Sequence, residues 1–483
     1  MTPSPMNAPL PSRSLLADAF RNAFALSILV LVSLPAASQE TAAEPALPAE
    51  PAEQIEPAEP SERIPARLWE EGDPGAAGSN DLVTVPGLYR AWLELPSGHE
   101  LGFNLEIDFR RDAQRRPIYP IAVINGIDAS PAVLEPQGPE GEARTGLVIG
   151  FADTDARIEA EIQQGGQMIS GEMIYSRDAN GEPVEYRLPF RAAYGDFRRY
   201  DTPEPEGPED PPTLATDWRV TFESRQGPAA MSVRLLPDGR HVQGTISTPT
   251  GDDGVLVGTF YDGRLRLSRF TGASGLLYDA TLQPDGSLAG TFHSLGHHTE
   301  TFTASPARDA VLPDLFTQTR WLEGVTPADL AFRDTAGSMT RLGELAPGPA
   351  LLYVFGTWCH NCSDATRYLN ELHERHADAL PIVGIAFESP ADFETQAAKV
   401  RSYAQAKGVR FPMLIAGERD KSAATETLGA LDRVRAYPTF VFIDREGEPV
   451  AVHQGFIGPA DPGRHAALRA GFDRRINAIL GGG

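Results

Sequence analysis

The chain contains two cysteines, Cys359 and Cys362, and both lie in the short segment YVFGTWCHNCSDA. Two thiols at this spacing can form a structural disulfide, supply half of a metal site, or exchange disulfides with another molecule. A disulfide across so short a loop removes little entropy from the unfolded chain, about 2 kcal/mol by the loop-entropy relation. A zinc site would need a fourth ligand beyond Cys359, His360 and Cys362, and usually a second pair of cysteines. Thiol–disulfide exchange is therefore the chemistry to weigh first.

The elements expected around the two cysteines suit such exchange. The apolar run ALLYVF, residues 350–355, predicts a buried strand, and a helix is expected to begin at the cysteines. Cys359 then lies at the N-terminus of this helix, where unpaired N–H groups and the helix dipole favour a thiolate over a thiol. Cys362, about one turn further along, can attack the mixed disulfide that Cys359 forms with a substrate. Trp358 is expected to cover the pair from one side.

Apolar strands alternate with helical segments from about residue 313 to the C-terminus. Further strands are predicted at 381–387, 411–416 and 439–444, and helices at 391–407, 422–429 and 462–480. A hairpin through Arg445-Glu446-Gly447 follows the strand at 439–444. This alternation is typical of an α/β domain with a mixed sheet that helices cover on both faces.

Three segments within residues 318–483 together resemble the thioredoxin fold, and most closely its TlpA/ResA-like extracytoplasmic branch. VFGTWCHNC is similar to the strand-to-helix signature of the active site, DLAFRDTAGSMTRLGEL to the hairpin that opens the domain, and AYPTFVFIDREGEPV to the segment with the family's cis proline. The resemblance implies a thiol-disulfide oxidoreductase with a redox-active disulfide between Cys359 and Cys362 and no cofactor. It also implies that Cys359 attacks, that Cys362 resolves, and that Trp358, Tyr437 and Pro438 bind the substrate.

Two positions refine this resemblance. Thioredoxin has a buried Asp six residues before its first cysteine, and Tyr353 stands there in this chain. ResA-like proteins carry a Glu after the second strand in a Glu-Ser sequence, and GIAFESP places Glu388 at that point. The resemblance thus implies that Glu388 lies near the pair and assists proton transfer when Cys362 attacks. The alternative is a surface carboxylate that caps the next helix.

The dipeptide between the cysteines, His360-Asn361, leaves the direction of electron flow open, because a His there can stabilise the thiolate and favour the reduced form. The resemblance favours reduction of protein disulfides, with electrons from a membrane thiol donor. Peroxiredoxins share the fold, but they have a Thr three residues before the peroxidatic cysteine, where this chain has Gly356. Peroxidase activity is therefore not expected.

The first part of the chain has the features of an export signal. Arg13 and Arg21 precede the apolar run AFALSILVLVSL, and a proline and three small residues follow it. Residues 1–38 are therefore predicted to be a secretory signal peptide, which places the protein in the periplasm or another extracytoplasmic compartment. An uncleaved N-terminal membrane anchor is the alternative. Residues 39–80, rich in Ala, Pro and Glu, are predicted to be a disordered linker.

Two β-rich domains are predicted at residues 81–200 and 216–307, with an acidic Pro-rich linker at 201–215 between them. Alternating apolar residues in GFNLEIDF and turns such as Asp262-Gly263 indicate antiparallel strands. A recurring Gly-Thr phrase after hairpins indicates a meander that closes into a barrel or a sandwich, and leaves one barrel or two open. The fold class is thus multi-domain, with an all-β N-terminal region and a C-terminal α/β thioredoxin-like domain.

The β-rich region offers no comparable set of residues for catalysis. His293, His297 and His298 are close in sequence, but without a nearby cysteine they are interpreted as part of a polar loop and not as a metal site. We expect these domains to bind a ligand or to act as spacers. A second hypothesis is therefore an envelope binding or organising protein whose β regions carry the function. The net charge of −24 argues against nucleic acid as a partner.

Overall fold

The computed structural model describes residues 82, 84–111, 115, 117–126, 128–138, 144–151, 154–179, 182–195, 198–202, 213–225, 227–236, 238–272, 274–307, 310, 312–376, 379–389 and 392–481. The predicted signal peptide, the linker at 39–80 and most of the linker at 201–215 lie outside these residues. All of the described residues belong to one compact unit. Within the described part of the chain, no helix is both long and apolar enough to cross a bilayer.

Eight of the described strands close into an antiparallel barrel in the order β1-β10-β9-β8-β7-β6-β5-β2. They are β1 (Gly87–Glu94), β2 (Glu100–Ile107), β5 (Ile121–Asn125), β6 (Asp128–Gln137), β7 (Gly146–Phe151), β8 (Arg157–Gln163), β9 (Met168–Ala179) and β10 (Glu182–Tyr194), with a small hairpin of β3 (Arg110–Arg111) and β4 (Pro117–Ile118) after β2. Every second residue of β8 is buried, namely Ile158, Ala160 and Ile162. An eight-stranded barrel is just wide enough for such side chains to fill it.

A second set of strands also closes on itself. It consists of β11 (Asp217–Phe222), β12 (Ala229–Leu235), β13 (His241–Thr248), β15 (Leu256–Tyr261), β16 (Arg264–Phe270), β17 (Gly275–Leu282), β18 (Leu288–Ser294) and β19 (His298–Pro306), with the short β14 (Gly251–Asp252) beside β13. β12 pairs with both β11 and β13, which completes the ring. Asp262 and Gly263 both have positive φ angles, as the predicted tight turn requires.

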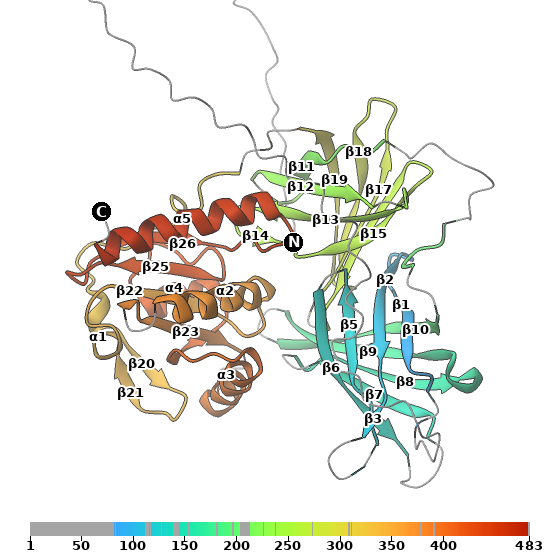
Figure 1. The fold of residues 1–483 in the computed structure, drawn as a ribbon, viewed down its shortest axis with the longest axis horizontal. Coiled ribbons are helices and arrows are strands. Elements are labelled where there is room, and N and C mark those ends of the chain that lie inside the picture. Colours follow the sequence, from blue (N-terminus) through green and yellow to red (C-terminus); the bar gives the residue numbers. More distant parts are fainter. Residues whose placement is uncertain are drawn as a thin grey trace, which may run out of the picture. The chain divides into compact units, whose positions relative to one another are not determined.

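The β-rich region therefore contains two closed barrels, which answers the question that the sequence left open (Figure 1). They contact each other through the buried side chain of Arg199. Its Nη1 donates to the carbonyl of Ser268 at 2.5 Å, and its Nη2 donates to the carbonyl of Ile124 at 2.6 Å. The Ser268 hydroxyl donates to the carbonyl of Gly102 at 2.6 Å. Burial lowers the pKa of Arg199 to about 10, so the guanidinium stays charged at neutral pH.

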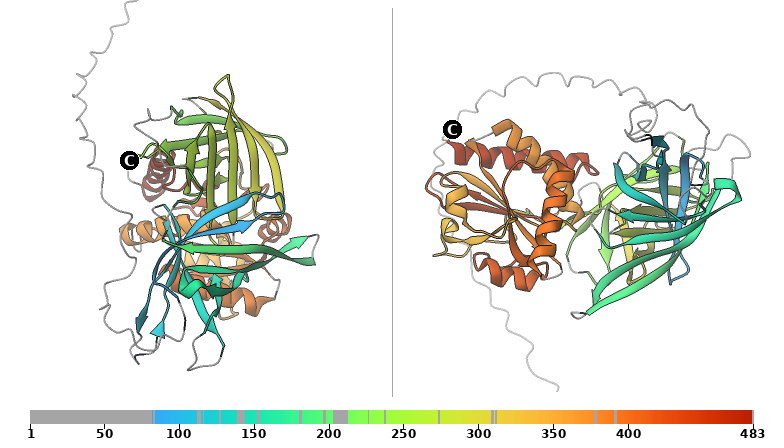
Figure 2. Two further views of the ribbon diagram at one scale, coloured as in Figure 1. Left: turned by 90° about the vertical axis from the view of Figure 1, so that its right-hand side faces the viewer. Right: turned by 90° about the horizontal axis from the view of Figure 1, so that it is seen from below.

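The C-terminal region is a seven-stranded mixed sheet in the order β21-β20-β24-β23-β22-β25-β26. Its strands are β20 (Ala331–Asp334), β21 (Met339–Arg341), β22 (Ala350–Phe355), β23 (Ile382–Glu388), β24 (Met413–Glu418), β25 (Thr439–Ile443) and β26 (Pro449–Gln454). The helices are α1 (Leu342–Leu345), α2 (His360–His376), α3 (Phe393–Lys407), α4 (Lys421–Leu428) and α5 (Pro462–Leu480), and they cover both faces of the sheet (Figures 1 and 2). The three central strands β22, β23 and β24 are parallel. All six residues of β22 are buried, as expected for a central strand with helices on both sides.

Candidate active site

Cys359 and Cys362 lie where β22 ends and α2 begins. The loop Gly356–Cys359 connects the two elements, and both cysteines are free thiols. Cys359 is 9% exposed, whereas Cys362 is 0% exposed. The backbone N–H of Cys362 donates to Sγ of Cys359 at 3.3 Å, a contact that supports negative charge on that sulfur. Cys359 is thus the accessible member of the pair, and Cys362 lies behind it.

The Cys362 thiol is held in its neutral form. Burial raises its pKa well above the ordinary 9.0, and the neighbouring Cys359 raises it further. A thiol must lose its proton before it can attack a disulfide. Any resolving role for Cys362 therefore needs a group that accepts this proton.

Trp358 and Tyr437 flank Cys359. Sγ of Cys359 lies 3.4 Å from the carbonyl oxygen of Tyr437, and the peptide bond between Tyr437 and Pro438 is cis. The half-buried Trp358 ring packs edge-on against Tyr437 with 5.3 Å between centroids, and its Nε1 donates to the carbonyl of Phe387 at 2.9 Å. A Cβ on Gly356 would lie 2.3 Å from that Nε1, so the glycine makes room for the indole.

Glu388 is the last residue of β23 and is fully buried. Its Oε1 accepts the backbone N–H of Thr357 at 2.7 Å, and its Oε2 accepts the Thr357 hydroxyl at 2.8 Å. Thr357 is two residues before Cys359, so the carboxyl group is tied to the loop that carries the accessible cysteine. The next helix is capped by Asp392, whose side chain accepts the N–H of Thr395. Glu388 is therefore neither on the surface nor a helix cap.

Tyr353 supports the first turn of α2, a role that sequence reasoning missed. Its hydroxyl donates to the carbonyl of Cys362 at 2.8 Å and lies 2.9 Å from Oγ1 of Thr366. The hydroxyl of Tyr403 donates to the same Cys362 carbonyl at 3.2 Å. Burial raises the pKa of Tyr353 well above 10, so this residue does not replace the Asp of thioredoxin as a proton acceptor. A polar residue within an otherwise apolar strand was the available signal.

The second barrel contacts the dipeptide between the cysteines. Nε2 of His360 donates to the carbonyl of Asp252 at 2.6 Å, which fixes the proton on that nitrogen. The carboxyl group of Asp252 accepts the N–H groups of Gly254 at 2.8 Å and Gly458 at 2.6 Å. Burial, with the charge of Arg269 adding to it, lowers the pKa of His360 to about 4. The imidazole is neutral at pH 7, so it does not stabilise the thiolate by a positive charge.

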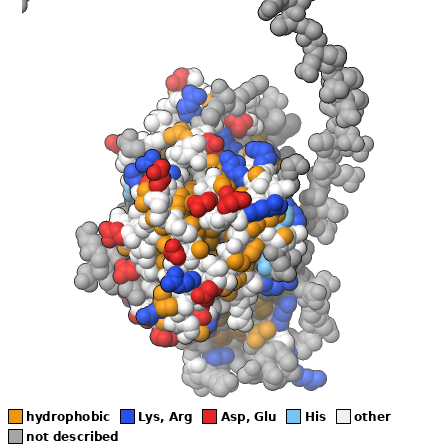
Figure 3. All heavy atoms as spheres, turned by 90° about the vertical axis from the view of Figure 1, so that its left-hand side faces the viewer, with side chains coloured by type: hydrophobic (Ala, Val, Ile, Leu, Met, Phe, Trp, Pro, Cys, Tyr) orange, Lys and Arg blue, Asp and Glu red, His pale blue; other side chains and the backbone are white. Residues whose placement is uncertain are grey.

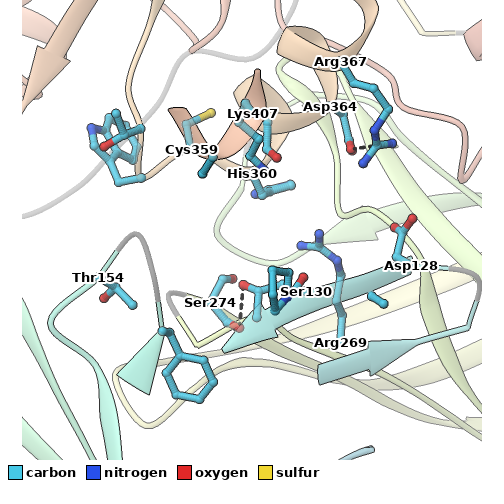
Figure 4. Close-up of a pocket in the computed structure, with 18 residues that line it drawn as sticks. Asp128, Ser130, Thr154, Arg269, Ser274, Cys359, His360, Asp364, Arg367 and Lys407 are labelled. Carbon is cyan, nitrogen blue, oxygen red and sulfur yellow. Dashed lines mark hydrogen bonds and ion pairs between the residues drawn. The ribbon is translucent and has the colours of Figure 1, made fainter. Parts of the chain in front are cut away.

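A cavity of about 470 Å³ opens beside Cys359. It is lined by Cys359 and His360 from the α/β region, by Asp128 and other residues of β6 in the first barrel, and by Arg269 at the end of β16 in the second barrel (Figure 4). The space in front of the accessible cysteine is thus bounded by both barrels and by the loop and helices of the α/β region. No local sequence pattern predicted that the barrels reach this site.

His293, His297 and His298 of the second barrel have separate partners. The ring nitrogens of His293 lie 3.1 Å from Thr299 Oγ1 and 3.0 Å from Thr291 Oγ1, and His298 lies 3.3 Å from Glu300. His297 packs against the ring of Tyr175. Among the residues that the structure describes, no three His, Cys, Asp or Glu side chains are grouped as metal ligands.

Comparisons with known proteins concern the C-terminal part of the chain. Residues 324–451 match the family model described as the AhpC/TSA family. The thiol-disulfide oxidoreductase ResA of Geobacillus kaustophilus is 27% identical over 143 residues, which cover 29% of this chain and 75% of ResA. A thiol:disulfide interchange protein of the thioredoxin family from Chlorobium tepidum is 23% identical, covers 32% of this chain and 96% of its own, and has a TM-score of 0.24. A secreted Mycobacterium tuberculosis disulfide oxidoreductase homologous to Escherichia coli DsbE is 20% identical, covers 29% and 97%, and has a TM-score of 0.23.

Proposed function

We propose that this protein, whose C-terminal domain is a TlpA/ResA-like oxidoreductase domain of the thioredoxin type, is exported and reduces protein disulfides through Cys359 and Cys362. One observation carries the proposal. The accessible Cys359 lies in front of the buried Cys362, whose N–H contacts its sulfur at 3.3 Å. This is the arrangement that an attacking and a resolving thiol require.

In the first step, the thiolate of Cys359 attacks one sulfur of the substrate disulfide. A bond forms between Cys359 Sγ and that sulfur, the substrate S–S bond breaks, and the leaving sulfur takes up a proton. We expect the carbonyl of Tyr437, which lies 3.4 Å from Cys359 Sγ, to accept an N–H of the substrate segment. We expect Trp358 and Pro438 to contact that segment as well.

In the second step, Cys362 loses its proton and attacks Cys359. The bond between Cys359 and the substrate breaks, the Cys359–Cys362 disulfide forms, and the second substrate sulfur leaves as a thiol. Two electrons have then passed from the protein to the substrate. We propose that Glu388 accepts the proton that Cys362 loses, because this buried carboxyl group is hydrogen-bonded to Thr357 in the active-site loop. A dithiol donor, which we place at the membrane, returns the pair to its reduced form.

Export rests on the N-terminal sequence, in which arginines, an apolar run and small residues follow one another as in a signal peptide. N-terminal sequencing of the protein purified from its native cells tests this part. A mature chain that begins near residue 39 supports export with cleavage. A chain that keeps residues 1–38 and sediments with membranes supports an anchor instead.

Insulin reduction by the full chain tests the enzymatic part. With dithiothreitol as the electron donor, the wild type should precipitate the insulin B chain faster than Cys359→Ser does. Equal rates would refute the proposal and leave the binding or organising function of the β barrels as the better hypothesis. Hydrogen peroxide in place of insulin tests for peroxidase chemistry, and we expect no Cys359-dependent consumption of peroxide.

A further inference from the structure

Arg269 is a buried cation that makes no hydrogen bond or ion pair with the residues that the structure describes, and the more distant charges of Asp253 and Asp364 act on it. It lies at the end of β16 and is 8% exposed. Its Nε is buried without a hydrogen bond. Its guanidinium lies against Gly254, where a Cβ would be 2.7 Å from Nε. Figure 4 shows the side chain reaching into the cavity toward His360, on the opposite wall.

The cavity has an excess of positive charge. Arg269, Arg367 and Lys407 line it together with two carboxylates, Asp128 and Asp364. Arg367 pairs with Asp364 at 3.6 Å and the charge of Arg269 also acts on Asp364, so three cations share two carboxylates. The chain as a whole carries a net charge of −24, and on the face shown in Figure 3 acidic and basic side chains are interspersed. The cationic lining is therefore a local feature of the cavity next to Cys359.

A buried guanidinium without a hydrogen-bonded anion is unfavourable, because its lost hydration is not replaced. The volume of about 470 Å³ lies in the range of about 300–1,000 Å³ that is typical of small-molecule sites. Cysteine-derived disulfides carry carboxylates a few bonds from sulfur, and Arg forms strong charge-assisted hydrogen bonds with carboxylates.

We propose that Arg269 binds a carboxylate of the disulfide substrate, so that the neighbouring S–S bond is presented to Cys359. The inference rests on the proposed function and specifies its substrate class, a disulfide with a carboxylate close to the sulfur. The carboxylate belongs either to a small disulfide or to an acidic residue beside a cysteine of a peptide. Arg269 is then a specificity-determining residue, and the second barrel is part of the substrate site.

Three small disulfides of different charge test this inference on the full chain. They are 3,3′-dithiodipropionate, which is anionic, bis(2-hydroxyethyl) disulfide, which is neutral, and cystamine, which is cationic. Each is mixed in excess with reduced protein, and the loss of protein thiols is followed in a single turnover, so that no external reductant is needed. The wild type should react with the anionic disulfide about tenfold faster than with the neutral one, as expected for a hydrogen bond to a charged group, and slowest with the cationic one.

Arg269→Gln should bring the ratio of the anionic to the neutral rate down to about one, because the charge that attracts the carboxylate is gone. Arg269→Lys should keep part of the preference for the anionic disulfide over the neutral one. Arg219→Gln, on an exposed position of the same barrel, should behave as the wild type. For the wild type alone, added salt should slow the anionic reaction and speed the cationic one.

Two results would overturn the inference: a wild type without preference between the charges, or an Arg269→Gln variant that slows all three disulfides equally. A wild type that is folded but reacts with none of the three would refute the proposed function itself.

Disulfide-linked peptides with Glu or Gln beside the cysteine identify the source of the carboxylate. A Glu preference that depends on Arg269 points to acidic peptides, and a preference confined to 3,3′-dithiodipropionate points to small disulfides.

Discussion

The carboxyl group of Asp252 couples the second barrel to the redox domain, and its proton should make this coupling depend on pH. Asp252 is 2% exposed, and its side-chain carboxyl group accepts the N–H groups of Gly254 and Gly458. Its backbone carbonyl accepts the Nε2–H of His360. Burial raises its pKa from 3.8 to about 7, and the charge of Asp364 adds to this. We therefore predict that Asp252→Asn changes how the stability of the protein varies with pH.

The magnitude follows from the two pKa values. Below pH 3.8, Asp252 is protonated in both the folded and the unfolded chain and contributes no pH dependence. Between about pH 4 and 7 the unfolded chain has lost this proton and the folded chain keeps it, so the free energy of unfolding falls as pH rises. The difference between 3.8 and about 7 corresponds to about 4 kcal/mol, at about 1.4 kcal/mol per pKa unit. Above pH 7 this loss is complete.

An Asn at this position stays neutral at every pH and keeps one acceptor for the two N–H groups. It should lower the free energy of unfolding by about 1 kcal/mol near pH 4, because one hydrogen bond is lost. Near pH 8 it should raise the free energy of unfolding by about 3 kcal/mol relative to the wild type, because the unfavourable buried charge is gone. The wild type should thus be the more stable protein near pH 4, and Asp252→Asn the more stable protein near pH 8.

Urea titrations followed by circular dichroism at pH 4.5, 6 and 7.5 measure this reversal. The matched control is Asp262→Asn, in an exposed turn with a positive φ angle that Asn tolerates. The free energy of unfolding of this control should vary with pH as that of the wild type does. If Asp252→Asn also paralleled the wild type, the carboxyl group would not hold its proton in the folded protein, and the reasoning would be wrong.

Two further substitutions test the roles assigned near the thiols. Glu388→Gln keeps the shape of the side chain but cannot take up a proton, so release of the second substrate thiol should slow about 100-fold, as is typical for loss of a general base. Rapid-quench measurement of that release checks this, and an unchanged rate would exclude Glu388 as the proton acceptor. Tyr353→Phe removes a hydroxyl that is hydrogen-bonded to the carbonyl of Cys362, so it should lower the free energy of unfolding by about 1 kcal/mol. The rate of insulin reduction should stay nearly constant. Lost turnover at unchanged stability would instead give Tyr353 a part in the chemistry.

Elements that are encoded in contiguous residues could be predicted from the sequence. The apolar run ALLYVF is β22 as predicted, because a central parallel strand is buried on both faces. The helix predicted at 462–480 coincides with α5, where an Asp-Pro start and a terminal glycine mark the ends. The contact between Cys359 and Tyr437 was implied by two motifs of one known fold.

The rest of the site depends on contacts between distant parts of the chain. His360 meets Asp252, which precedes it by 108 positions, and Arg269 reaches the cavity from a barrel whose position no local pattern encodes. Alternating strands indicate a sheet but not its closure, so two barrels could not be told from one. The sequence also suggested that a charged His360 could stabilise the thiolate. Burial against the second barrel, a contact between distant parts of the chain, keeps the imidazole neutral instead.

The central claim is that Cys359 attacks a substrate disulfide and Cys362 resolves the product. Its most direct test is the intact mass of reduced Cys362→Ser after incubation with a disulfide-bearing peptide. We expect a stable adduct of one peptide chain, located on Cys359 and released by dithiothreitol, and no lasting adduct on the wild type, because Cys362 resolves it. An adduct on Cys362 of the Cys359→Ser variant that forms at the same rate, or no adduct on either variant, would contradict the assigned roles.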